Sequence, residues 1–69
     1  MGVKLIATYY ILNYAFHVYG CYDEYTEINK YNFYDLYDNK GNCINEGTPF
    51  FKIPTWKDIK EYVEENNII

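Results

Sequence analysis

The first 22 residues combine β-branched and aromatic side chains with almost no charge, a composition that favours strands over helices. A run of this length exceeds one strand of ordinary size. We therefore predict two strands, 3–11 and 14–22, with a turn near Leu12 and Asn13 between them. A continuous amphipathic helix over 5–19 is the alternative.

Residues 29–47 carry the pattern of a β-hairpin. The sequence DNKG at 38–41 suits a tight turn in which Gly41 adopts a positive φ. This turn places Leu36 opposite Ile44 on the returning chain. Both faces of the hairpin are then apolar, one with Tyr34, Leu36 and Ile44 and the other with Tyr31, Phe33, Tyr37 and Cys43.

Two further segments are predicted to be connectors. Residues 20–30 are polar and acidic and predict a loop that can hold a helical turn from Thr26. Residues 46–56 predict an extended segment, because Pro49 and Pro54 disfavour helix in the residue before them.

A helix is predicted near the C-terminus. Thr55 is a good N-cap, and Asp58 three residues later completes a variant of the capping box. The helix is expected to end near Asn66 and to dock through an apolar stripe. This stripe consists of Trp56, Ile59 and Val63, with Tyr62 beside them.

Together these elements predict an α+β fold: a small antiparallel sheet of three or four strands with one C-terminal helix packed on one face. One domain is expected over residues 1–69. Trp56 is expected to anchor the helix by touching Leu36 or Ile44. The residues expected to build the fold are Leu36, Gly41, Ile44, Thr55, Trp56, Ile59 and Val63.

The composition limits the classes of function. The net charge is −4 and no arginine is present. Affinity for nucleic acid comes mainly from Lys and Arg at the phosphates, so we expect no direct nucleic-acid binding. The abundance of Tyr, Asn, Ile and Lys, whose codons are rich in A and T, points to a low-GC bacterium, a phage or a mobile element.

Residues 5–22 lack a formal charge and are the one candidate for a membrane span or signal peptide. The stretch also contains tyrosines, Thr8, Asn13 and His17, whose polar groups are costly in hydrocarbon. We therefore expect no membrane association and a cytoplasmic location.

The two cysteines, Cys21 and Cys43, lie far apart in the sequence, and the chain has one histidine. A structural zinc site needs about four ligands at closer spacing, so none is expected. In a cytoplasmic protein both thiols are expected to be reduced and to act as small hydrophobic side chains. A disulfide is the alternative for a secreted chain.

No group of residues in the sequence has the spacing and surroundings of a catalytic site. On a strand, His17 and Cys21 would lie too far apart for a hydrogen bond. A calcium loop centred on Gly41 would lack several ligands, and the acidic residues at 23–27 have no apolar pocket to raise a pKa. We expect no cofactor, no metal and no enzymatic activity.

The ten tyrosines are the remaining feature. One interpretation is that they serve only as core, but tyrosine is also enriched where proteins meet. One helix covers one sheet face, so we predict that Tyr31, Phe33 and Tyr37 on the other face bind a protein partner or form a homodimer. A small acidic non-enzymatic protein-binding module is the expected function. The alternative is a DNA-mimicking inhibitor of a nucleic-acid enzyme, since ten side chains are carboxylates.

Overall fold

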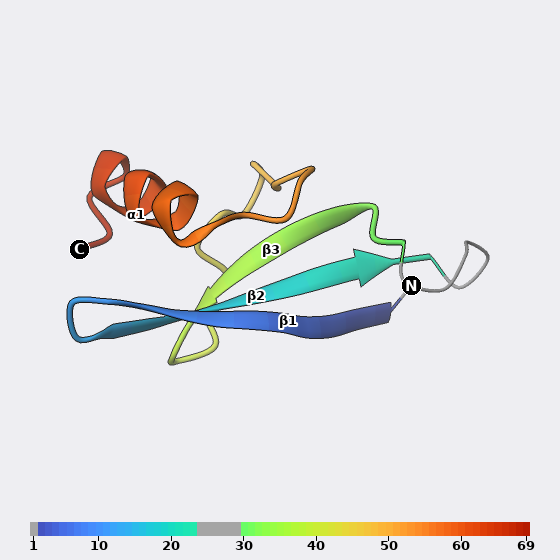
Figure 1. The fold of residues 1–69 in the computed structure, drawn as a ribbon, viewed down its shortest axis with the longest axis horizontal. Helices are drawn as coiled ribbons and strands as arrows, with labels where there is room; N and C mark the ends of the chain where they lie inside the picture. The colour runs from blue at the N-terminus through green and yellow to red at the C-terminus, as the bar shows by residue number, and fades with distance from the viewer. Residues whose placement is uncertain (1, 24–29) are drawn as a thin grey trace.

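The computed structural model describes residues 2–23 and 30–69, which hold three strands followed by one helix. Strands β1 (Gly2–Ile11), β2 (Tyr14–Tyr22) and β3 (Phe33–Asp38) form an antiparallel sheet with β2 in the centre. Helix α1 (Trp56–Glu65) lies over one face of the sheet, near the end where β1 and β2 are joined (Figure 1). The predicted α+β architecture is confirmed.

Strands β1 and β2 form the hairpin predicted from composition, and the alternative helix over 5–19 is wrong. A tight turn at Leu12 and Asn13 joins them, and Leu12 adopts a φ of 56° there. In β2, Phe16 and Val18 are both buried on one face of the sheet. Residues two positions apart share a face in a strand, whereas in a helix they point in different directions. The helical turn predicted from Thr26 lies outside the described residues.

A β-bulge interrupts β1 between Leu5 and Ala7. The extra residue, Ile6, packs with the core. Strict alternation would place Val3 and Leu5 on the same face as Tyr9. The bulge moves Val3 and Leu5 to the opposite face, away from the helix, because it shifts the pairing by one residue.

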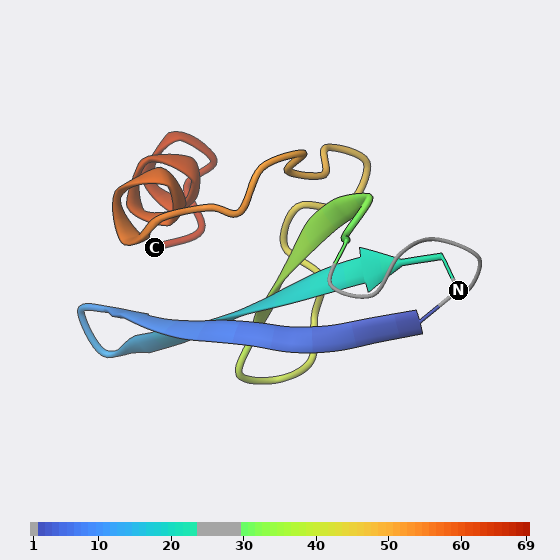
Figure 2. The ribbon, with the colours of Figure 1, turned by 45° about the vertical axis from the view of Figure 1, so that its right-hand side comes forward.

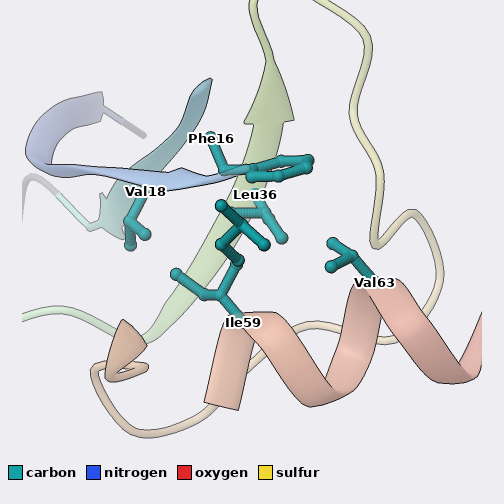
Figure 3. Close-up of a cluster of buried hydrophobic side chains, with 6 residues drawn as sticks. Phe16, Val18, Leu36, Ile59 and Val63 are labelled. Atoms are coloured by element: carbon teal, nitrogen blue, oxygen red, sulfur yellow. The ribbon is translucent and has the colours of Figure 1, made fainter. Parts of the chain in front are cut away.

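The core lies between the sheet and α1 (Figure 3). Ile59 and Val63 of the helix point toward Leu36 of β3. Each of these three side chains is fully buried, and such burial stabilises a fold by about 1.5–3 kcal/mol per side chain. The buried cluster consists of Ile11, Phe16, Val18, Leu36, Ile59 and Val63.

The helix begins as its sequence predicts but docks differently. The Thr55 side chain accepts a hydrogen bond from the Asp58 N–H, and the Asp58 carboxylate accepts one from the Thr55 N–H, which completes the capping box. Trp56, however, is 44% exposed and lies outside the buried cluster that holds Leu36, so it is not the buried anchor that the stripe predicts. Trp56 is the first residue of the helix and points to the rim of the sheet.

The turn after β3 has the predicted geometry. Gly41 adopts a φ of 87°, its N–H donates to the Asp38 carbonyl, and Tyr37 pairs with Cys43. The Asp38 carboxylate also accepts bonds from the backbone N–H and side-chain amide of Asn42 and from the backbone N–H of Lys40, and these bonds lower its pKa. The returning chain pairs with β3 only in isolated bridges and not as a fourth strand.

Candidate functional site

The two outer edges of the sheet differ in how their backbone groups are paired. The Asn32 N–H donates to the Cys21 carbonyl, so the backbone of Cys21 faces β3. The direction alternates along an antiparallel ladder, so the backbone of Gly20 faces β1. The same alternation directs Tyr34, Leu36 and Asp38 outward from β3, and Val3, Leu5, Thr8 and Tyr10 outward from β1.

The outer edge of β3 is covered by the chain that follows it (Figure 2). Phe50 exchanges two backbone hydrogen bonds with Tyr34, at 2.7 and 3.1 Å. The Leu36 carbonyl accepts from Ile44, and the Asp38 N–H donates to the Asn42 carbonyl.

Asn45 completes this edge with its side chain and is 1% exposed. Its Oδ1 accepts from the Leu36 N–H at 2.8 Å. Its Nδ2 donates to the carbonyls of Tyr34 and Thr48, at 3.3 and 3.5 Å. The amide thus replaces the backbone of a fourth strand and leaves the outward groups of β3 satisfied.

The outer edge of β1 has much less cover. Trp56 donates its indole N–H to the Tyr10 carbonyl at 2.8 Å. Across residues 2–23 and 30–69, this is the one hydrogen bond made by the outward backbone groups of Val3, Leu5, Thr8 and Tyr10. As far as residues 2–23 and 30–69 are concerned, the edge of β1 is therefore open along its N-terminal half.

The face of the sheet away from α1, here called the open face, is rich in apolar side chains. Val3, Leu5 and Tyr10 are 64%, 50% and 69% exposed on it. Tyr19 and Tyr37 meet edge to face beside them, with ring centroids 5.3 Å apart. No element within the described ranges covers these residues as α1 covers the other face.

An open hollow of about 410 Å³ lies on this face, between the strands and the turn after β3. It is lined by Val3, His17, Tyr19, Tyr37, Asp38, Asn39 and Gly41. The imidazole of His17 contacts two other residues at this hollow. Its Nδ1 lies 3.0 Å from the Thr8 hydroxyl, and its Nε2 lies 3.2 Å from Asn39 Oδ1. An amide oxygen only accepts, so Nε2 carries the proton and the imidazole joins β1, β2 and the turn.

The two cysteines are free thiols near Asp35. Cys21 is 2% exposed and donates to the Asp35 carboxylate at 3.5 Å. Burial, and then the charge of Asp35, raises the pKa of Cys21 to about 11. The same two causes raise the pKa of Cys43. Neither thiol is thus activated as a nucleophile, and His17 is engaged elsewhere.

The three residues predicted to bind a partner do not all lie on the open face. Phe33 and Tyr37 lie on the open face, as expected from their alternation in β3. Tyr31 does not, which corrects the prediction. It precedes β3, and its ring lies against Gly20 and Tyr34 on the face that carries the helix.

Several residues of these surfaces were not identified from the sequence. Val3 and Leu5 reach the open face through the bulge, which no glycine or proline marks. Asn45 looks like an ordinary turn residue in the sequence. The one available signal is its position in a polar segment directly after a hairpin whose outer edge still needs partners.

Comparisons with known proteins place this chain in no group: no protein-family model, curated protein or solved structure matches it. Residues 2–23 and 30–69 contain no helix that is long and apolar enough to cross a membrane. Within these same residues, no three His, Cys, Asp or Glu side chains are grouped to hold a metal ion.

Proposed function

We propose that this chain is a small acidic, non-enzymatic protein-binding module of the cytoplasm, and that its open face binds another protein. The observation that supports this is the one-sided cover of the sheet. Helix α1 buries one face, while Val3, Leu5 and Tyr10 remain at least half exposed on the other. Contiguous apolar surface with aromatic side chains is typical of protein contacts.

The charge on the open face favours a partner other than a second copy. Asp35 is the formally charged strand residue on this face, flanked by Phe33 and Tyr37. Stacking two identical faces about a two-fold axis would bury two Asp35 carboxylates in one contact, at a high desolvation cost. A different protein with a basic side chain in an apolar surface would pair with Asp35 instead. The homodimer predicted from the sequence becomes an alternative outcome of the test.

Among the residues that the structure describes, no specific arrangement of charge supports the DNA-mimicking inhibitor. In α1, Lys57 and Lys60 lie among the acidic residues, and the Lys60 ammonium is 3.6 Å from the Glu64 carboxylate. Such pairing reduces the field that a row of carboxylates would need in order to imitate phosphates.

The test is affinity capture from a lysate of the source organism, with wild type and variants as baits. The double change Phe33→Glu with Tyr37→Lys should abolish capture of the partner. Leu5→Lys and Leu5→Glu should both weaken capture, because either change places a charge in the apolar part of the open face. Glu61→Lys on the exposed side of α1 is the matched control and should capture normally.

Analytical ultracentrifugation of the wild type alone should show a monomer at high micromolar concentration. A dimer that the double change dissociates would assign the face to a second copy and overturn the proposed partner. Equal capture by wild type and the double variant would overturn binding through the open face.

A further inference from the structure

We propose that the segment Val3–Leu5 at the open edge of β1 receives an added strand, and that this strand has an acidic residue between two apolar ones. This inference rests on the proposed function and specifies how the partner protein binds. It commits to an extended segment of a different polypeptide.

The backbone chemistry of the edge supports an extended peptide. Val3 and Leu5 direct their N–H and C=O groups away from β2, with no hydrogen bond to any described residue. The geometrically equivalent groups of Tyr34 and Leu36 on β3 are all bonded. A row of alternating donors and acceptors at strand spacing matches the backbone of another strand.

Two features confine the site to the N-terminal half of β1. The bulge between Leu5 and Ala7 breaks the straight edge, which limits the length of an added strand. Farther along, the indole of Trp56 already occupies the Tyr10 carbonyl. The open stretch is therefore short, and a partner needs additional contact with the open face for affinity.

Lys4 determines the charge of the added strand. It is the one charged residue of β1 and is exposed on the face that carries the helix. If two copies paired through Val3–Leu5 in antiparallel register about a two-fold axis, their Lys4 ammonium groups would lie directly opposite each other, which is destabilising. An acidic residue opposite Lys4 makes the favourable pair.

The neighbours of that acidic residue meet a different environment. Side chains opposite Val3 and Leu5 project onto the open face, because successive residues of a strand alternate in direction. There they contact two apolar side chains that are 64% and 50% exposed, at the rim of the hollow that Val3 lines. Apolar residues suit both positions, which gives the pattern apolar–acidic–apolar.

The test is an NMR titration of the full chain with the capped peptide TVEVT as the probe. Binding should shift the amide signals of Val3 and Leu5 and slow their hydrogen exchange at least about threefold at saturation. The Lys4 amide, which faces β2, should exchange as before. The control peptide TVKVT should bind about fivefold more weakly, because it places a like charge opposite Lys4.

The matched variant Lys4→Glu should reverse this preference and bind TVKVT more tightly than TVEVT. An unchanged preference in this variant would overturn the assignment of the acidic position. No response of Val3 and Leu5 at millimolar peptide would overturn strand addition. Shifts confined to Phe33 and Tyr37 would also overturn it while leaving the open face as a binding surface, so the two proposals fail separately.

Discussion

The two edge strands of this sheet differ in how their outward backbone groups are paired. Each edge strand directs a row of backbone donors and acceptors outward. On β3 these groups are satisfied by the returning chain and by the buried amide of Asn45. On β1 the described part of the chain supplies one such bond, from the indole N–H of Trp56 to the C-terminal end of the strand. A small chain can therefore complete one edge with its own residues and leave the other available.

Among changes at the two edges, the largest effect is expected from Asn45→Ala, which should make the covered edge resemble the open one. The change leaves the buried Leu36 N–H without an acceptor and removes three further bonds of the side chain, so it should cost about 3 kcal/mol. Urea unfolding measures the loss. Asn32→Ala, at an exposed asparagine, is the control and should stay within about 0.5 kcal/mol. A loss below about 1 kcal/mol for Asn45→Ala would show that the edge is held by backbone bonds alone.

The second-largest effect is expected from Cys21, which lies in the central strand between the two edges. Its thiol should make the free energy of unfolding depend on pH in the alkaline range. Its pKa rises from 9.0 to about 11 on folding, so the unfolded chain loses the thiol proton first. This contribution is complete below pH 9 and should decrease by about 2 kcal/mol as the pH rises to 11. Unfolding of wild type and Cys21→Ala over this range isolates it from the tyrosines and lysines. Parallel curves would contradict a tightly packed thiol.

Gly41→Val tests the turn that returns the chain to the edge of β3. A φ of 87° is unfavourable for a β-branched residue, so we expect a loss of about 1–2 kcal/mol. An added Cβ would meet no atom within 4 Å, so the penalty comes from the backbone alone. Gly41→Asn should recover part of the loss, since asparagine tolerates this conformation better. Thermal unfolding compares the two variants, and equal losses would argue against the backbone explanation.

The smallest effect is expected at the open edge. Trp56→Phe removes the bond to the Tyr10 carbonyl but retains an aromatic ring, so it should cost about 1 kcal/mol or less. Ile59→Ala should cost about 2–5 kcal/mol and is the internal comparison, because Ile59 is fully buried. Unfolding in denaturant ranks the two variants. If Trp56→Phe proved the more damaging, the indole would contribute more to docking α1 than its exposure indicates.

The elements of the fold were predictable because each depends on local chemistry. β-branched and aromatic residues gave the strands of the first hairpin, DNKG gave the turn at Gly41, and Thr55 with Asp58 gave the start of the helix. These signals act within a few residues. They therefore remain valid in the folded chain.

The orientation of individual side chains was harder to predict. Tyr31 was placed by extending the alternation of β3 two residues too far, since the strand begins at Phe33. Trp56 fits the helical stripe, yet as the first residue of the helix it reaches the rim rather than the core. The orientation of Val3 and Leu5 depends on the bulge in β1. The position of a bulge is determined by packing across strands and not by local propensity.

Gly20 and Tyr31 are linked more closely than their separation in the sequence indicates. A Cβ on Gly20 would lie 2.5 Å from the ring of Tyr31, so the ring occupies the space that any other residue at position 20 would need. If related sequences are found, these two positions should change together. A larger residue at 20 should occur with a small one at 31, and a glycine at 20 with an aromatic ring at 31. Such paired substitution would provide independent support for the contact between the two positions.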